Sequence, residues 1–88
     1  MQDKINNIRD YINGVKTRCT YNAAAQALGI KPAEFKKLLG DRIPENSWFV
    51  NTGAGEPVGY VDAEKHPELY RTKRIISSAE VITRNVDL

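Results

Sequence analysis

Residues 20–40 are TYNAAAQALGIKPAEFKKLLG, a stretch that carries the signals of two consecutive short helices. Thr20 belongs to the residue types that cap helix N-termini, and the alanine-rich segment 21–28 after it consists mostly of strong helix formers. Gly29 can close this helix in the left-handed conformation, and Pro32 suits a first helical turn, where its missing N–H would be unpaired anyway. The stretch therefore predicts a helix over 21–28, a tight turn, and a second helix that starts at Pro32.

The second helix, expected over residues 32–39, has two different faces. Phe35, Leu38 and Leu39 are spaced to point inward together. Lys36 and Lys37 take the other side. Two short helices joined by a tight glycine-containing turn, with paired lysines outward on the second, are typical of a helix-turn-helix.

A further helix is expected upstream, over residues 3–15. Its apolar residues Ile5, Ile8, Ile12 and Val15 recur at spacings of three and four, so they form one stripe on a helix surface. The chain therefore begins with three predicted helices.

A β-hairpin is expected after the helices. Residues 47–51 (SWFVN) and 58–61 (VGYV) are rich in aromatic and β-branched residues, and the connector 52–57 is rich in glycine. A hairpin directly after a helix-turn-helix is the wing of a winged-helix domain. Trp48 and Phe49 are neighbours on the predicted strand, so one is expected to face the core and the other to face outward.

The remaining residues predict a short helical segment at the C-terminus. Ser77 and Glu80 have the spacing of a capping box. The expected fold is thus a small α+β winged helix-turn-helix in residues 1–61, with a C-terminal extension in residues 62–88 that packs on the same domain.

Length and composition narrow the functional classes. The chain has 88 residues, 41% of them apolar, and a domain of this size has little room for a deep substrate pocket. Cys19 and His66 are the only residues of their types, which excludes an internal disulfide and a Cys/His metal site. Without a signal-peptide or membrane-spanning pattern, we expect a cytoplasmic, non-enzymatic binding module with no cofactor, no metal and no membrane partner.

The charge distribution favours a polyanionic partner. Residues 1–44 hold eight Lys and Arg against four Asp and Glu, a net +4, whereas the remainder holds five against seven, a net −2. This asymmetry and the helix-turn-helix pattern predict double-stranded DNA as the partner, with Lys16, Arg18, Lys31, Lys36 and Lys37 contacting phosphates. The full set of expected DNA-binding residues is Lys16, Arg18, Thr20, Tyr21, Asn22, Lys31, Lys36, Lys37, Thr52 and Gly53.

A family resemblance supports this prediction. The matching residues are Thr20-Tyr21, Gly29, Pro32, Lys36-Lys37-Leu38-Leu39-Gly40, Phe49-Val50-Asn51-Thr52-Gly53 and Gly59-Tyr60. Together they resemble the DNA-binding domain of alkylguanine-DNA alkyltransferases and alkyltransferase-like proteins. The resemblance implies a winged helix-turn-helix that enters the minor groove, with Tyr21 helping to rotate a nucleotide out of the stack. Lys36 stands roughly where that family has the arginine that fills the vacated space.

The chain departs from the family at the position of the cysteine that accepts the alkyl group. Asn46 stands where the acceptor cysteine would be, and the segment around it, Glu45–Trp48, holds no thiol, histidine or arginine. Alkyl transfer by the family mechanism is therefore excluded. The sequence is also similar to small bacterial or phage winged-helix proteins of unassigned role, which share the Asn-Ser-Trp strand and a His-Pro segment, here His66-Pro67.

Three functions remain open at the level of sequence. The first is a DNA-binding regulator or accessory factor of a bacterium or mobile element, acting in transcription regulation or a related process. The second is a protein-interaction module, for example a phage protein that binds a host factor. The third is a sensor of DNA lesions without catalysis. DNA binding predicts an affinity that falls steeply with salt, whereas an apolar protein interface predicts weak salt dependence.

Overall fold

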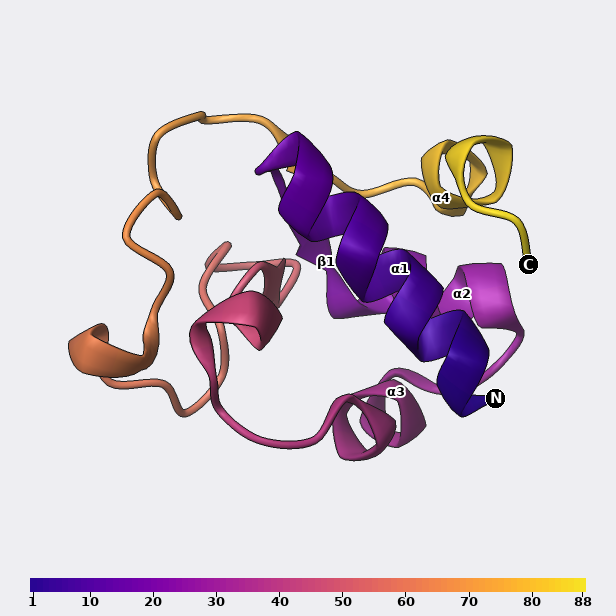
Figure 1. The fold of residues 1–88 in the computed structure, drawn as a ribbon, viewed down its shortest axis with the longest axis horizontal. Coiled ribbons are helices and arrows are strands. Elements are labelled where there is room, and N and C mark those ends of the chain that lie inside the picture. The colour runs from indigo at the N-terminus through magenta and orange to yellow at the C-terminus, as the bar shows by residue number, and fades with distance from the viewer.

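The computed structural model describes residues 1–88 and shows a small α+β fold with four helices and a three-stranded sheet, which confirms the predicted class (Figure 1). Its elements are α1 (Gln2–Val15), β1 (Arg18–Thr20), α2 (Tyr21–Leu28), α3 (Pro32–Leu39), the 3-10 turn η1 (Pro44–Asn46), β2 (Phe49–Val50), the 3-10 turn η2 (Asp62–Glu64), β3 (Ile75–Ile76) and α4 (Ala79–Asn85).

The two predicted short helices are confirmed with their predicted bounds. The Thr20 hydroxyl caps α2 by accepting a hydrogen bond from the Ala23 N–H at 3.0 Å. Gly29 ends α2 with φ of 72°, a left-handed conformation that favours glycine. Pro32 is the first residue of α3. Local signals in this stretch therefore determine where both helices begin and end.

The first helix lies across α2 and β1 and carries much of the core (Figure 1). Ile5, Ile8 and Ile12 of α1 are fully buried, as the stripe predicted. Val15 departs from the prediction because its side chain is 43% exposed. The helix ends there, since Lys16 takes a left-handed conformation with φ of 52° and turns the chain toward β1.

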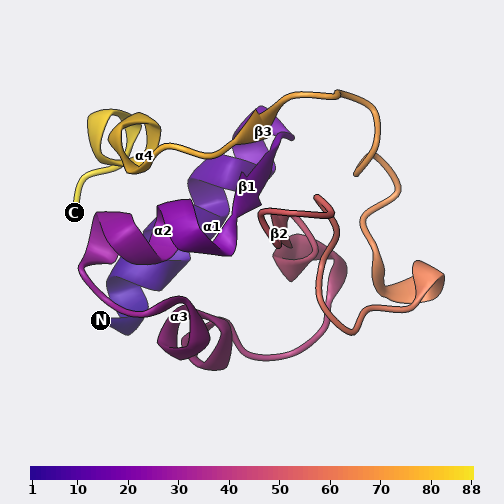
Figure 2. The ribbon, with the colours of Figure 1, turned by 180° about the vertical axis from the view of Figure 1, so that it is seen from behind.

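The sheet is parallel throughout, with the strand order β2-β1-β3 (Figure 2). Cys19 of the central strand β1 is paired with Phe49 on one side and with Ile76 on the other. The sequence analysis did not identify β1 or its pairing. β1 pairs with one edge of Phe49 and Val50, and their other edge stays unpaired because residues 51–61 contain no strand.

The prediction of a hairpin over residues 47–61 is therefore wrong, because its second strand is absent. Residues 58–61 contain no strand, and the Asn51 N–H donates to the Glu56 carbonyl to close a loop instead. Pro57 has no N–H for a ladder, and Gly55 and Gly59 have positive φ values of 68° and 77° that bend the backbone out of the extended conformation. A loop, residues 51–60, stands where the hairpin was expected; we call it the 51–60 loop.

Trp48 and Phe49 are both fully buried, so neither is offered to a partner, and the C-terminal segment helps to cover them. The Phe49 ring meets the Phe35 ring of α3 edge-on, with centroids 5.1 Å apart. The Trp48 ring packs against the His66 ring at 4.7 Å, and its indole N–H donates to the Asn13 side chain at 3.1 Å. The chain on either side of β2 covers both faces of the strand.

Residues after position 61 pack against the helices and the sheet. Leu69, Ile76, Ile82 and Val86 belong to the same buried cluster as the core residues of α1, α2 and α3. The C-terminal helix α4 packs mainly on α2 (Figure 2). Its cap is Ser78, whose hydroxyl accepts from the Glu80 N–H, so the expected capping box at Ser77 is wrong by one residue.

None of the four helices combines the length and the hydrophobicity that a bilayer crossing requires. No three His, Cys, Asp or Glu side chains are grouped so that they could hold a metal ion.

Candidate nucleic-acid interface

The start of α2, the helix α3 and the 51–60 loop meet on one surface, which we call the α3 face. The Tyr21 hydroxyl accepts a hydrogen bond from the Val58 N–H at 3.1 Å, and this bond fixes the loop against α2. The Asn22 amide donates to the Thr52 hydroxyl at 3.0 Å and makes a second connection between the same two segments. The structure thus brings Tyr21, Asn22 and Thr52, three of the expected DNA-binding residues, to one place.

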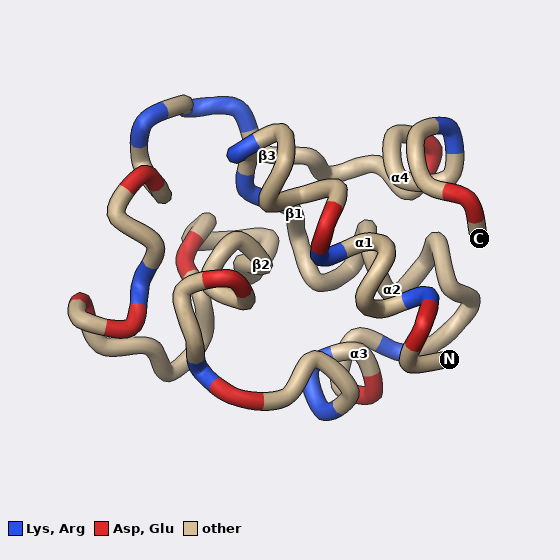
Figure 3. The backbone as a smooth tube through the Cα atoms, viewed as in Figure 1, with Lys and Arg blue, Asp and Glu red and all other residues tan.

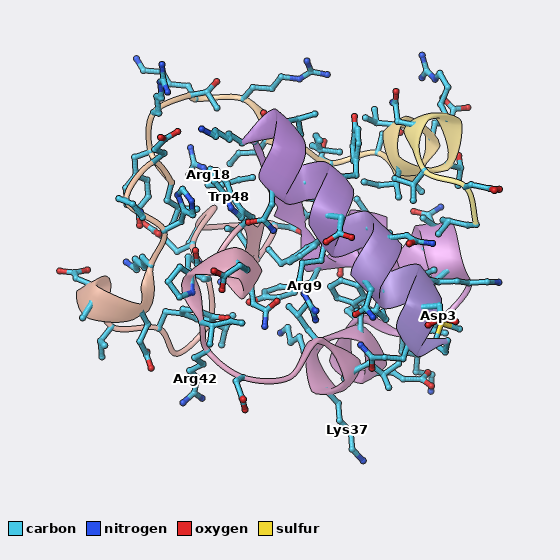
Figure 4. The ribbon with its side chains drawn as sticks, viewed as in Figure 1. Asp3, Arg9, Arg18, Lys37, Arg42 and Trp48 are labelled. Carbon is cyan, nitrogen blue, oxygen red and sulfur yellow. The ribbon has the colours of Figure 1, made fainter.

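The paired lysines of α3 lie on this face and are exposed. Lys36 extends over the Tyr21 ring, with its Nζ atom 4.7 Å from the ring centre. Lys37 points away from the body of the molecule (Figure 4). Both lysines occupy the last turn of α3, where a cation is favoured by the negative end of the helix dipole.

A pocket of about 200 Å³ opens between these segments. Its lining residues are Tyr21, Lys36, Leu39, Gly40, Arg42, Val58 and Tyr60. Arg42 closes one side: its guanidinium lies so close to Gly59 that a Cβ atom there would be 2.9 Å from it. The pocket therefore joins aromatic surface to two cations.

The two phenols of the pocket stay protonated at neutral pH. Burial, together with the nearby Tyr21 and Glu64, raises the pKa of Tyr60 to about 12, although Arg42 and Arg9 act in the opposite direction. Burial also raises the pKa of Tyr21. Both hydroxyls can therefore donate hydrogen bonds, and the cations at the rim suit a planar or anionic polar group.

The sequence analysis missed Arg42, Val58 and Tyr60 as members of this site. They follow the predicted helices in loops, where no periodicity marks a residue as a neighbour of α3. One signal was present, because Gly59 next to Tyr60 indicates a backbone turn that can bring an aromatic side chain back toward the helices.

Lys16 does not lie on the α3 face, and Arg18 contacts that face only at the Gly55 carbonyl of the 51–60 loop. The strand β1 carries them toward the opposite end of the molecule, where the views in Figures 1 and 2 both place the start of β1 above α3. Lys16 forms an ion pair with Glu68 at 3.3 Å. Arg18 donates to the carbonyls of Gly55 at 2.9 Å and Thr72 at 3.2 Å, so its guanidinium is engaged in holding loops together.

The other expected residues have mixed positions. Thr20 is buried and its hydroxyl is used as the cap of α2, which leaves it unable to meet a phosphate. Lys31 is exposed at the start of α3, at the far end of that helix from Gly40. Gly53 is exposed beside Thr52 in the 51–60 loop.

Neither candidate nucleophilic position supplies a reactive group to the pocket. Burial raises the pKa of the Cys19 thiol to about 12, so the thiol stays protonated and shielded. Asn46 is buried, and its amide donates to the carbonyls of Leu39 at 3.1 Å and Asp41 at 2.7 Å. The side chain at the expected acceptor position therefore fastens the end of α3 to η1.

No protein-family model matches this chain, and no curated protein or solved structure is significantly similar to it. The resemblance to alkylguanine-DNA alkyltransferases stays a prediction from the residues quoted above.

Proposed function

We propose that this protein is a non-enzymatic DNA-binding module of the cytoplasm, a small regulator or accessory factor that contacts double-stranded DNA through the α3 face. The observation that carries the proposal is the pair Lys36 and Lys37, exposed on the second of two consecutive helices that are joined by a three-residue turn. That layout is used by helix-turn-helix proteins to present a helix to a groove of DNA.

The 51–60 loop supports the same proposal although it is not a hairpin. Bonds from Val58 to Tyr21 and from Asn22 to Thr52 hold it beside the start of α2. Its exposed backbone at Thr52 and Gly53 can meet the sugar-phosphate chain next to the groove that α3 enters. In this proposal the loop takes the role that the wing takes in winged-helix proteins.

Chemical-shift mapping by NMR tests this surface directly. Titration of the labelled protein with a short duplex is expected to shift the amide resonances of Asn22, Lys36, Lys37, Thr52 and Gly53. The duplex should contain no lesion, so that the general DNA-binding proposal is tested first. A titration in which none of these five amides shifts would contradict the proposal.

A second candidate function, recognition of a damaged base without alkyl transfer, is favoured by the pocket beside Lys36. The Tyr60 side chain with its protonated hydroxyl and the Arg42 guanidinium offer stacking surface and hydrogen-bond donors within about 200 Å³, and the buried Tyr21 forms part of the pocket wall. The test is the ratio of affinities for an alkylated and an unmodified duplex of the same sequence. A ratio near one would remove this candidate and leave the first untouched.

The protein-interaction alternative would present Trp48 or Phe49 and the C-terminal segment to a partner. Trp48 and Phe49 are buried, so only the C-terminal segment remains as its surface. Salt dependence still separates it from DNA binding. An affinity for a protein that is insensitive to salt, without affinity for DNA, would favour it over the present proposal.

A further inference from the structure

A second basic surface lies at the other end of the molecule from α3. Four cations contribute to it: Lys16 at the end of α1, and Arg71, Lys73 and Arg74 in the segment before β3. All four are exposed. Figure 3 shows Lys and Arg positions clustered along the segment before β3 and near the start of β1, and Figures 1 and 2 agree that α3 lies at the opposite end. We call this surface the Arg71 patch.

The Arg71 patch is held in place by contacts made beneath it. The Arg18 guanidinium donates to the Thr72 carbonyl at 3.2 Å, and Ile75, three residues further along the chain, pairs with Arg18 in the sheet. On the other side, Glu68 accepts from Arg71 at 3.2 Å and pairs with Lys16 at 3.3 Å. The backbone of segment 71–74 is therefore anchored at both of its ends. The cations of the segment project from this fixed backbone.

The charges of the Arg71 patch are only partly balanced. Glu68 is the one carboxylate paired with Lys16 and Arg71, and no ion pair involves Lys73 or Arg74. Both of these side chains are therefore free to meet an anion. Between Lys16 and Arg71 the surface is hollowed, and the hollow is lined by Val15, Lys16, Thr17, Arg71 and Thr72.

The chemistry of this hollow suits phosphate groups better than a protein surface. Val15 is its only apolar lining residue, so a protein partner would find no apolar anchor. Cations and hydroxyl groups are the side chains that contact the phosphates of nucleic acids. A duplex presents its phosphates as a regular row, which matches several cations spread along one segment.

We propose that the Arg71 patch binds the phosphate backbone of a second DNA segment, so that one chain bridges two duplexes. The proposal rests on the proposed function, in which the α3 face holds the first duplex. The principal extents of the molecule are 30 × 23 × 22 Å, and surfaces at opposite ends of such a small body meet two different duplexes.

Energy transfer between two duplexes, one with a donor dye and one with an acceptor dye, measures the bridging. Wild-type protein is expected to bring the dyes together at low salt. The double variant Lys73→Glu/Arg74→Glu is expected to lose at least about tenfold in bridging, because two phosphate contacts become repulsive. Its affinity for a single labelled duplex, measured by anisotropy at excess DNA, is expected to stay within about threefold of wild type.

A matched control variant changes the net charge by the same amount outside the Arg71 patch. The double variant Lys4→Glu/Arg84→Glu alters exposed cations of α1 and α4 and leaves the Arg71 patch intact. Its bridging signal is expected to be at least half that of the wild-type protein. Glu68→Gln, which removes the one acid of the patch, is expected to increase bridging at a given salt concentration.

Three results would overturn the proposal. Wild-type protein that binds one duplex in a salt-dependent manner but never brings two together refutes bridging and leaves the proposed function standing. Bridging that persists in Lys73→Glu/Arg74→Glu assigns it to another surface, such as paired α3 faces in a dimer. An absence of any anisotropy change with wild-type protein removes the proposed function and this proposal together.

Discussion

The Nζ atom of Lys36 lies 4.7 Å from the centre of the Tyr21 ring, so the outer face of α3 is fastened to the first residue of α2 by a cation over an aromatic ring. The same Tyr21 accepts the hydrogen bond of Val58. One buried tyrosine therefore sets the relative positions of the two helices and the 51–60 loop, which are the three parts of the α3 face.

This contact predicts a measurable coupling between Lys36 and Tyr21. In a double-mutant cycle with Lys36→Met and Tyr21→Leu, the free energies of unfolding are expected to differ from additivity by about 0.5–1 kcal/mol. Denaturant titrations of the four proteins supply the values. Lys37→Met with Tyr21→Leu is the control cycle and should be additive, because Lys37 does not contact the ring. Additivity in both cycles would contradict the contact.

The capping bond of Thr20 predicts a stability difference between two small substitutions. Thr20→Ser keeps the hydroxyl that accepts from Ala23 and should cost little, whereas Thr20→Val keeps the shape and removes the acceptor. Loss of the cap is expected to lower the free energy of unfolding by about 1 kcal/mol, as chemical denaturation would measure. Equal stabilities of the two variants would show that the cap contributes nothing.

Gly59 and Gly29 provide a matched pair for the contact with Arg42. Both have a positive φ, 77° and 72°, so an alanine at either position costs about 1–2 kcal/mol of backbone strain. Only at Gly59 would the new Cβ meet Arg42, at 2.9 Å, whereas a Cβ at Gly29 would have no neighbour within 4 Å. Gly59→Ala is therefore expected to be the more destabilising, and the excess should vanish in an Arg42→Ala background. An excess that survives there must have another cause.

Cys19 predicts a dependence of stability on alkaline pH. Burial raises the pKa of its thiol from 9.0 to about 12 in the folded protein, so the folded state resists loss of the proton that the unfolded chain releases. The contribution to stability is complete below pH 9 and is lost progressively as the pH rises from 9 toward 12. Unfolding free energies at pH 8 and pH 10 should thus fall more for wild type than for Cys19→Ala. Equal falls would contradict a buried, protonated thiol.

Sequence alone predicted the helices around the turn because their signals are local. A cap at Thr20, a left-handed glycine at position 29 and a proline at position 32 each act within a few residues of their own position. The strand β1 was missed for the opposite reason. It has three residues, and its existence depends on partners at Phe49 and Ile75 that are distant along the chain. The hairpin that a local reading of residues 47–61 predicted is absent because residues 51–60 fold into a loop that contains Pro57 and two glycines with positive φ.

The residues of the candidate site also divide into those that local sequence signals predict and those that depend on distant parts of the chain. Lys36 and Lys37 could be placed on the outer face of α3 from periodicity, whereas the hydrogen bond between Asn22 and Thr52 depends on the course of the 51–60 loop. Lys16 and Arg18 are close to α2 in sequence, yet an extended strand moves the chain about 3.3 Å per residue and carries them away from α3. Arg42 and Tyr60 joined the site through loop geometry, which has no periodic signature.

The central claim, that the α3 face binds double-stranded DNA, is tested most directly by two single charge reversals. Lys37→Glu and Arg84→Glu change the net charge equally, and each removes an exposed cation from the last turn of a short helix, α3 or α4. Their effects on helix stability should therefore be similar. Anisotropy of a labelled duplex, recorded for both variants and wild type over a range of salt concentrations, measures the difference.

Lys37→Glu is expected to weaken binding at least about tenfold and to reduce the slope of log affinity against log salt by about one, since one phosphate contact is lost. Arg84→Glu is expected to stay within about threefold of wild type, with an unchanged slope. Equal affinities of the two variants, or wild-type binding that does not change with salt, would contradict the claim.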